Sequence, residues 1–572
     1  MSDISVYTAS YDVVVVGSGA GAMTAALCAA DKGLSTLVVE KSNFYGGTSA
    51  LSGGVIWVPC NHQQAAAKVK DSREQALRYL KASTQQKVPE ARLLAYLENA
   101  PKMLEYLESK TPVHYTVMPQ YPDYYQSLPG ALPGGRSLDP HMFDISQLGD
   151  EYQQLRPAAT AVLMLGKVSM TAHKAARMLN KSKGWQWDAF KLMMRYYLDF
   201  GWRLKTKRDR YSASGNALVA ALRKGMLDRG IALWLKTDLT DLCVENGRVC
   251  GIQATKEGYP VSIQAKRAVI LACGGFEQNQ LLREKYLPQP SHARWSVTPP
   301  NNNTGAALLA GQKIGAATAF MDQAWWVPTM PVIDEDTPRA IFAERHQPGC
   351  IVVNSKGSRF VNEAEPYLEF VNRMYEEDGK NGSRAVPAWL IFDAGFHARS
   401  AMGPLMPSQF IPDKKLPKAW RSSVYWKAGT LTELAEQIGV DAKGLTATVQ
   451  RYNQYAREGK DPDFNKGANC FDRYYGIVGN RPNPCVAPLD KAPFYAVRFD
   501  PGDTGTNGGL LTDEHAQVVR EDGTSIPGLY AIGNTSASVM GPSYPGAGAT
   551  IGPAMTFAYV AANHIAATQD QH

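Results

Sequence analysis

Residues 12–22 read DVVVVGSGAGA, four consecutive valines followed directly by closely spaced glycines. A continuous apolar run of this kind is typical of a central parallel strand that is covered on both faces. Residues 23–30, MTAALCAA, then predict a helix of small side chains. Gly17 permits the tight turn, Gly19 lets the backbone approach a pyrophosphate, and Ala22 allows helix and strand to pack closely. Because free N–H groups at a helix N-terminus favour negative charge, the stretch predicts a dinucleotide site.

A second predicted strand, residues 36–40 (TLVVE), ends in an acid. Glu40 lies about twenty residues beyond the glycines, the usual place of a carboxylate that binds a ribose 2′-hydroxyl. Taken alone, Glu40 would equally suit a solvated strand end, but the preceding motif favours the ligand role. Lys41 follows, although an acid in the ribose position argues against a 2′-phosphate.

The loop at residues 44–54 (FYGGTSALSGG) indicates which dinucleotide is bound. In a nicotinamide dehydrogenase the chain would normally continue its alternating strands and helices here. A loop rich in backbone amides and hydroxyls instead suits a larger, buried cofactor, so we expect FAD rather than NAD. The residues expected at FAD in these two motifs are Gly17, Gly19, Ala20, Gly21, Ala22, Glu40, Lys41, Gly46, Gly47, Thr48, Ser49, Ser52, Gly53 and Gly54.

Length and composition set the limits for the rest of the chain. A chain of 572 residues exceeds a typical single core, so two or more domains are expected. The net charge of +7 is mild and gives no evidence for nucleic-acid binding. The eight cysteines form no C-x-x-C pair, so we expect neither a disulfide framework nor a metal site. With no signal segment and no apolar run of spanning length, a cytoplasmic location is expected.

Two further strands end in glycines at distant places in the chain, at residues 268–276 (AVILACGGF) and 529–534 (LYAIGN). They suggest one sheet assembled from both ends of the chain. The predicted fold is therefore α/β, a Rossmann-like FAD-binding domain over 1–291 and 486–572, with an α+β catalytic domain inserted over 292–485. Ala272, Gly274, Gly533 and Asn534 are expected at the cofactor.

Periodicity predicts several more elements. Amphipathic helices are expected over 71–110 and a helix over 215–229. Strands are expected over 231–235, 239–244 and 249–252, the last two joined by a tight Asn246-Gly247 hairpin.

Residues 171–210 combine crowded aromatic and apolar side chains with eleven lysines and arginines. This composition is typical of an interfacial membrane helix, in which each basic residue near an anionic leaflet adds on the order of 1 kcal/mol. The alternative is a core or subunit-interface helix with a solvated basic end.

Three motifs far apart in the chain are rich in tyrosine or glycine: YPDY at 121–124 with PGGR at 133–136, NEAEPY at 362–367, and YPGAGATIGPAM at 544–555. The tyrosine-dense loop at 121–136 would by itself fit pocket lining or simple packing equally well. Together with the first stretch, the motifs resemble the flavoprotein family of fumarate reductases, succinate dehydrogenase flavoprotein subunits and 3-ketosteroid dehydrogenases. Within that family the resemblance is to the 3-ketosteroid Δ1-dehydrogenases.

Differences from other members of this family are also informative. Covalent members carry a histidine in the second glycine loop, which is absent at 46–54, so FAD is expected to be noncovalent. Soluble fumarate reductases have a histidine and a threonine before a late Gly-Gly, whereas residues 503–509 read DTGTNGG. No arginine clamp for two carboxylates accompanies the tyrosine motifs, so fumarate is the weaker substrate.

The resemblance implies a 1,2-desaturation, with hydride from carbon 1 passing to flavin N5 and a proton from carbon 2 passing to a base. Tyr367 would be that base, acting as a tyrosinate supported by Tyr124, with Tyr121 and Tyr125 as alternatives to Tyr124. The Tyr544 hydroxyl and the Gly548 N–H would stabilise the oxygen on carbon 3. Because an unperturbed tyrosine has a pKa of about 10, an alkaline activity optimum is expected. Gly548, Thr550 and Ile551 are also expected at FAD.

Other functions remain open at this stage. One is a 3-ketosteroid Δ4-(5α)-dehydrogenase or another FAD oxidoreductase of the same family, and another is a steroid-binding or redox-sensing flavoprotein without turnover. The tyrosines could also be packing residues only. The expected partners are a 3-ketosteroid and a quinone or other electron acceptor, with contact at the inner face of the cell membrane through 171–210.

Overall fold

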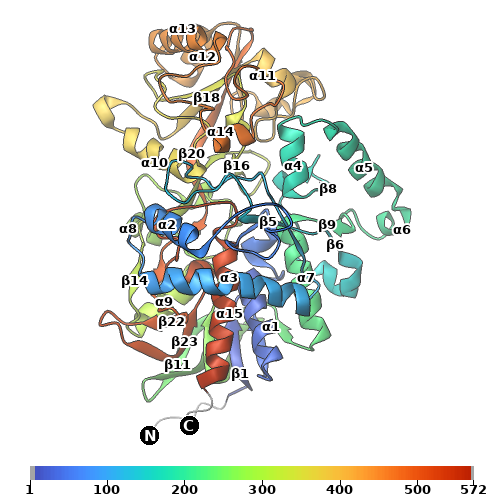
Figure 1. Cartoon of the computed structure of the whole chain (residues 1–572), viewed down its shortest axis with the longest axis vertical. Coiled ribbons are helices and arrows are strands. Elements are labelled where there is room, and N and C mark those ends of the chain that lie inside the picture. The colour runs from blue at the N-terminus through green and yellow to red at the C-terminus, as the bar shows by residue number, and fades with distance from the viewer. Residues whose placement is uncertain (1–6, 569–572) are drawn as a thin grey trace.

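A sheet built from both ends of the chain forms the lower part of the molecule (Figure 1). In the computed structural model, which describes residues 7–568, its strands run in the order β10-β2-β1-β13-β12-β11. β13 also pairs in parallel with β23, with Val269 opposite Leu529, so the two distant strand-glycine endings are neighbours, as predicted. The strands are β1 Ala9–Val16, β2 Thr36–Val39, β10 Ala232–Trp234, β11 Thr237–Glu245, β12 Arg248–Lys256, β13 Tyr259–Leu271, β22 Gln517–Val519 and β23 Ser525–Ala531.

The valine run occupies the centre of this sheet. Val13 to Val16 are buried, and β1 is parallel to both β2 and β13. The helix after the glycines, α1 (Ala20–Asp31), packs against the C-terminal helix α15 (Ile551–Ala567). Small residues permit this close contact, since a Cβ on Gly21 would lie 3.0 Å from the Ala554 carbonyl oxygen.

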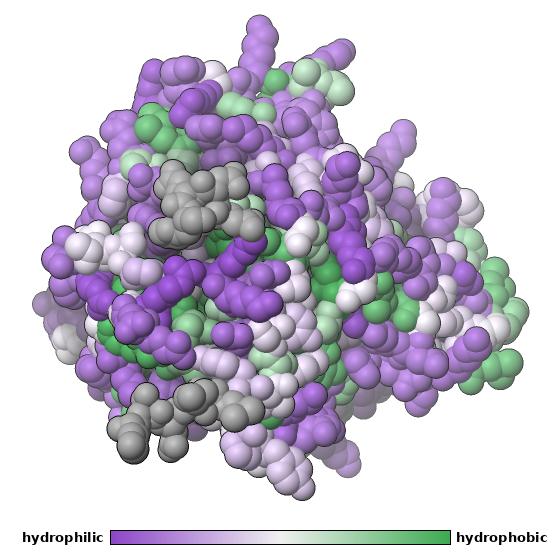
Figure 2. Space-filling view, turned by 90° about the horizontal axis from the view of Figure 1, so that it is seen from below, coloured by the Kyte–Doolittle hydropathy of each residue, from purple (hydrophilic) through white to green (hydrophobic). Residues whose placement is uncertain are grey.

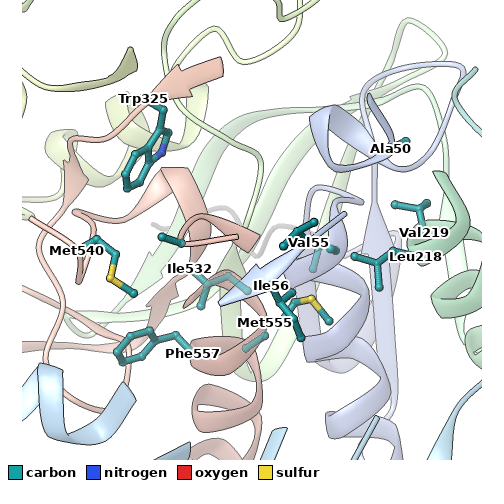
Figure 3. Close-up of a cluster of buried hydrophobic side chains, with 14 of the residues drawn as sticks. Ala50, Val55, Ile56, Leu218, Val219, Trp325, Ile532, Met540, Met555 and Phe557 are labelled. Atoms are coloured by element: carbon teal, nitrogen blue, oxygen red, sulfur yellow. The ribbon is translucent and has the colours of Figure 1, made fainter. Parts of the chain in front are cut away.

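Residues from widely separated segments share the core beside this sheet (Figure 3). Leu218 and Val219 come from α7 (Ser214–Asp228), Ile56 from β3 (Ile56–Trp57), and Met555 and Phe557 from α15. All are buried, so the two ends of the chain are joined by apolar packing as well as by strand pairing.

The other predicted elements of this half also form. Helices α2 (Arg73–Ser83) and α3 (Glu90–Lys110) occupy the segment predicted as amphipathic. The tight hairpin is present, with Asn246 and Gly247 both at positive φ between β11 and β12. Shorter elements around them are β4 Tyr115–Val117, β5 Ser137–Pro140, β6 Phe143–Asp144, β9 Tyr211–Ser212, α8 Gln280–Tyr286 and α9 Ala306–Lys313.

A second, antiparallel sheet forms the upper part of Figure 1, in the order β16-β15-β20-β18-β17, with β19 on β20. Leu434 and Leu445 of the covering helices α12 and α13 pack against Ile351 and Ile391 of its strands. The elements are β15 Ala324–Met330, β16 Arg339–Ala340, β17 Cys350–Val353, α10 Tyr367–Glu377, β18 Ala388–Asp393, α11 Ala394–Arg399, β19 Trp426–Ala428, α12 Leu431–Ile438, α13 Ala442–Arg457, α14 Cys470–Tyr474 and β20 Phe494–Thr506.

The strand β20 bears on the division into domains. It lies within 486–572, the segment assigned to the FAD-binding domain, yet it pairs with β15 and β18 of the second sheet. The returning chain therefore completes the second sheet before it reaches β22 and β23. The boundary at 485/486 stays a prediction, and this pairing argues for a boundary after β20.

Residues 171–210 project at the right of Figure 1 as α4 (Ala172–Leu179), α5 (Trp185–Leu198) and α6 (Phe200–Arg203). On α5 only Leu192 and Tyr196 are buried, in a small cluster with Val168 of β8 (Val168–Ser169), which pairs with β7 (Leu163–Met164). Across residues 7–568, no helix is both long and apolar enough to cross a bilayer.

Candidate active site

A cavity of about 1440 Å³ is lined by residues from both sheets and from the projecting helices α4 and α5. Typical pockets for one small ligand measure about 300–1,000 Å³, so this cavity has room for two ligands side by side. Every predicted site residue lines it except Gly46. The cofactor residues in its wall are Gly17, Gly19, Ala20, Gly21, Ala22, Glu40, Lys41, Gly47, Thr48, Ser49, Ser52, Gly53, Gly54, Ala272, Gly274, Gly533, Asn534, Gly548, Thr550 and Ile551.

One end of the cavity is formed by the turn between β1 and α1. Gly17 has φ +110°, and a Cβ there would lie 2.4 Å from the Ala272 carbonyl oxygen, so only glycine lets this turn meet the end of β13. The Ala20 N–H donates to Ser49 Oγ at 3.1 Å, which ties the second glycine loop to the N-terminus of α1. The two loops predicted to hold the dinucleotide therefore form one continuous wall.

Glu40 is an oriented acceptor in that wall. The Ser18 hydroxyl donates to one carboxylate oxygen of Glu40, and the Ser42 N–H donates to the other at 2.8 Å. Each oxygen keeps acceptor capacity, which suits ribose hydroxyls. Gly46 lies behind the wall and has a supporting contact, because its N–H donates to Ser18 Oγ at 3.0 Å.

These residues fit FAD. Glycine backbone from both loops leaves a side-chain-free cradle, in which a Cβ on Gly47 would lie 3.8 Å from the Gly19 Cα. The helix N-terminus suits the pyrophosphate, and Glu40 suits the ribose. Residues 46–54 include no histidine, so this loop offers no imidazole for covalent attachment.

Three tyrosines from distant motifs meet in the same cavity. Their ring centroids are separated by 5.5 Å for Tyr124–Tyr367, 5.6 Å for Tyr124–Tyr544 and 5.2 Å for Tyr367–Tyr544. Tyr124 comes from the loop at 121–136, Tyr367 is the first residue of α10, and Tyr544 precedes α15. The fold thus brings all the predicted catalytic tyrosines together.

The loop at 121–136 is fixed by buried ion pairs. Arg136 is buried and contacts Asp71 and Asp123, each at 2.7 Å. The Tyr124 N–H donates to the Pro545 carbonyl at 2.9 Å, which joins this loop to the turn that carries Tyr544. Because a buried charge left without its partner is costly, these pairs hold the loop in one position.

Hydrogen bonds distinguish Tyr124 from its neighbours. The Tyr124 hydroxyl donates to the Tyr367 hydroxyl at 3.4 Å. The Tyr121 hydroxyl instead bonds to the Tyr475 hydroxyl at 2.8 Å, and the Tyr125 hydroxyl donates to Glu369 at 3.0 Å. Tyr124 is therefore the tyrosine of that loop that contacts Tyr367.

The surroundings of Tyr367 act on its acidity in opposite directions. Burial raises the pKa of Tyr367 well above its usual value, and the nearby Tyr544 raises the pKa further. The hydrogen bond from Tyr124 lowers it. Tyr367 also begins α10, where the helix dipole favours an anion. The site thus keeps the phenol neutral at neutral pH and provides one contact, the hydrogen bond from Tyr124, that favours the phenolate.

Two hydrogen-bond donors are available beside the tyrosines. Thr550 Oγ1 donates to the Tyr544 hydroxyl at 3.2 Å, which leaves the Tyr544 proton for another acceptor. The Gly548 N–H has no acceptor within residues 7–568. Gly548 has φ +93°, and a Cβ there would lie 2.4 Å from the Ile56 backbone, so a side chain is excluded. A carbonyl oxygen can receive both donors.

Several wall residues carried no recognisable signal in the sequence. Phe471 of α14 lies 4.6 Å from Tyr124, and Phe342 lies 5.1 Å from Tyr367, measured between ring centroids. Tyr475 also lines the cavity. These aromatic residues belong to no motif, and their sequence positions lie far from that of Tyr124, so only the tertiary fold brings them together.

Comparison with known proteins agrees with this arrangement. The FAD binding domain family matches residues 12–551. The 3-oxosteroid 1-dehydrogenase of Mycobacterium tuberculosis is 42% identical over 564 residues, with 97% of this chain and 98% of that protein covered. A crystal structure of 3-ketosteroid Δ1-dehydrogenase from Sterolibacterium denitrificans in complex with 1,4-androstadiene-3,17-dione has a TM-score of 0.96 and 55% identity, covering 98% of this chain and 100% of that one.

A more distant structure shares the fold alone. The 3-ketosteroid Δ4-(5α)-dehydrogenase from Rhodococcus jostii RHA1 has a TM-score of 0.66 and 21% identity, covering 99% of this chain and 98% of that one. The predicted fold class and the predicted family are confirmed, and FAD is the cofactor. The chain belongs to the family of FAD-binding flavoproteins that includes the 3-oxosteroid 1-dehydrogenases.

Proposed function

We propose that this flavoprotein is a 3-oxosteroid 1-dehydrogenase, which introduces a double bond between carbons 1 and 2 of a 3-ketosteroid. The observation that carries the proposal is the group of Tyr124, Tyr367 and Tyr544 in one cavity wall with Gly548, whose N–H has no acceptor in the described part of the chain. The Tyr544 hydroxyl and the Gly548 N–H can both donate to one carbonyl oxygen. They share the cavity with Tyr367, which can accept one proton, and with its hydrogen-bond partner Tyr124.

The Tyr544 hydroxyl and the Gly548 N–H hold the oxygen on carbon 3. As negative charge develops on this oxygen, preorganised donors stabilise it and so make the hydrogens on carbon 2 acidic. Tyr367 takes the proton from carbon 2 in its phenolate form and becomes a neutral phenol, and the hydrogen bond from Tyr124 to the Tyr367 oxygen stabilises that phenolate before the transfer. Bound FAD supplies the acceptor for the hydride that leaves carbon 1. One proton and one hydride leave together, so the steroid loses two hydrogens and two electrons.

The product of a saturated substrate tests the proposal against its nearest rival. With 5α-androstane-3,17-dione and an artificial electron acceptor, we expect the 1-ene, identified by NMR of the isolated product. Formation of the 4-ene would instead assign a Δ4-(5α)-dehydrogenase. The matched control is the analogue without the 3-keto group, which should not react because its carbon 2 is not acidified.

The projecting helices support a second proposal, attachment to the inner face of the cell membrane. Trp187, Phe190 and Phe200 are 58%, 50% and 68% exposed, and Lys191 stacks on the Trp187 ring at 5.2 Å. Hydrophobic side chains gather at the right-hand edge of Figure 2, the side on which Figure 1 places α5 and α6. Exposed aromatics beside lysines suit a bilayer interface. This position would also bring the site near a lipid-soluble quinone, the electron acceptor that we propose.

Vesicle sedimentation tests this attachment. At low salt, we expect the protein to pellet with vesicles that contain phosphatidylserine, and the Trp187→Ser/Phe200→Ser variant to lose most of this binding. Tyr259→Ser removes an aromatic side chain that is 75% exposed on the β12–β13 hairpin and serves as the control. Retention of the unmodified protein in the supernatant would refute the attachment.

A further inference from the structure

A polar patch whose two cations form no ion pair in the described part of the chain lies in the wall of the cavity. Lys181 follows α4, Arg399 ends α11, and Ser400 comes next in the chain; all three line the same cavity as Tyr367 and Tyr544. Lys181 and Arg399 are half-buried, and Ser400 is buried. The patch thus places two cations and a hydroxyl in the cavity whose tyrosines are proposed to bind the 3-ketone.

Backbone contacts hold the two cations on one surface. Gln347 Nε2 donates to the Leu179 carbonyl at 2.8 Å, and Arg399 Nη2 donates to the Pro348 carbonyl at 2.8 Å. Residues 347–348 therefore connect the end of α4 to the end of α11. Burial lowers the pKa of Lys181, and the positive charge of Arg399 lowers it further, as expected for two cations close together.

Neither cation forms an ion pair within residues 7–568. The carboxylate that acts on Arg399, Asp393, is engaged elsewhere, since its oxygens accept the N–H groups of Phe396, Asp490 and Lys491. The Ser400 hydroxyl is also without a partner in the described chain, although the residue is only 2% exposed. Arg399 donates only to backbone carbonyls, those of Gly395 and Pro348, so no carboxylate in the described chain neutralises its charge. A half-buried cation without a counter-charge and a buried hydroxyl without a partner are costly in the absence of a ligand.

We propose that Lys181, Arg399 and Ser400 bind a carboxylate on the side chain of the steroid substrate. This inference rests on the proposed function and deepens it: among 3-ketosteroids, those with an acidic side chain on ring D are bound most tightly. The cavity wall also includes Phe342, Met406 and Phe410, apolar surface that suits the steroid ring system. The Arg399 guanidinium and the Lys181 ammonium can both donate to the two oxygens of one carboxylate. Such charge-assisted hydrogen bonds are stronger than hydrogen bonds between neutral groups.

The test compares 3-oxo-4-cholen-24-oic acid with its methyl ester, which differs only in the charge at the side-chain end. Binding to the FAD-containing protein is measured by isothermal titration calorimetry, and turnover by steady-state kinetics. We expect the acid to bind at least about tenfold more tightly than the ester, as hydrogen bonds to charged groups predict. Lys181→Met and Arg399→Met should each reduce this acid-to-ester ratio about tenfold. Lys183→Met, which changes an exposed lysine outside the cavity wall, should leave the ratio unchanged.

Equal affinities of the unmodified protein for the acid and the ester would refute the proposed carboxylate subsite. This comparison uses only the unmodified protein, so it does not depend on whether a variant folds. The proposed subsite would also be refuted if Lys181→Met and Arg399→Met left the acid-to-ester affinity ratio unchanged. Turnover of 4-androstene-3,17-dione, which has no carboxylate, separates the two proposals. Its absence would refute the proposed function, whereas its presence with equal acid and ester binding would refute the subsite alone.

Discussion

The acidity of Tyr367 is set by residues that act in opposite directions on one oxygen. Burial favours the neutral phenol, and the hydrogen bond from Tyr124 favours the phenolate. Because the raised pKa leaves little phenolate at neutral pH, activity should rise as the pH increases. The supporting residue therefore affects the rate most at the lower pH values.

Tyr124→Phe removes the contact that lowers the pKa of Tyr367. The pKa of Tyr367 then rises further, so the limb of kcat that increases with pH should move to higher pH. At pH 7, kcat should fall about tenfold, the effect of one hydrogen bond of ordinary strength. The measurement is kcat with 4-androstene-3,17-dione between pH 6 and pH 10.

Tyr474→Phe is the matched control, because the Tyr474 hydroxyl makes no hydrogen bond within residues 7–568 and its ring lies 4.5 Å from that of Tyr121. It should keep the original pH profile. An unchanged profile for Tyr124→Phe would show that Tyr124 does not tune the base.

At this scale the sequence identified the tyrosine motifs but left Tyr121, Tyr124 and Tyr125 as alternatives. The loop at 121–136 has no regular structure, so no periodicity predicts where each side chain points. Its orientation is fixed by Arg136 with Asp71 and Asp123, and by the Tyr125 hydroxyl, which accepts the Tyr544 N–H at 3.0 Å. These contacts join residues up to 419 positions apart in the chain.

At the scale of elements, the turn that precedes α15 carries both residues proposed to contact the cofactor and the proposed donor to the substrate. Gly548 gives this turn its positive φ and its contact with β3. The Trp57 N–H donates to the Gly548 carbonyl at 3.3 Å, so a displaced turn would also disturb β3.

Gly548→Ala should destabilise the protein by about 3 kcal/mol, through strain at positive φ and a clash with the Ile56 backbone. The variant should also retain less FAD, since the same turn lines the cradle. Thermal unfolding and the ratio of flavin to protein absorbance measure the two effects.

Gly258→Ala is the control that introduces backbone strain without a steric clash. Gly258 has φ +91°, and a Cβ there would have no neighbour within 4 Å among the described residues. It should cost only about 1 kcal/mol and leave FAD content unchanged. Equal losses in the two variants would show that the contact with β3 is unimportant.

Elements defined by local patterns were predicted well, and the pairing of β13 with β23 followed from their matching strand-glycine endings, but the assignment of a strand without such a motif was not predicted. The valine run, α1 and the Asn246-Gly247 hairpin follow from local sequence and are present. The assignment of β20 was not predictable in this way, since its partners β15 and β18 lie more than a hundred residues away.

For the whole molecule, the decisive feature is a cavity to which both sheets contribute. The first sheet supplies the FAD cradle, and the connections of the second sheet supply Tyr367, Phe342 and Phe471. The sequence predicted the cradle because it is a local motif. It could not predict the apolar wall or the patch at Lys181 and Arg399, because these exist only once α4, α11 and α14 meet.

The most direct test of the account is an anaerobic titration of the FAD-containing protein with 4-androstene-3,17-dione, followed by its absorbance spectrum and by analysis of the steroid. We expect the flavin absorbance to bleach as 1,4-androstadiene-3,17-dione appears in equal amount. In Tyr367→Phe the steroid should still bind, but bleaching should be slower by about 10²–10⁴-fold, the usual contribution of a general base. A spectral shift without bleaching in the unmodified protein, or full activity of Tyr367→Phe, would contradict the account.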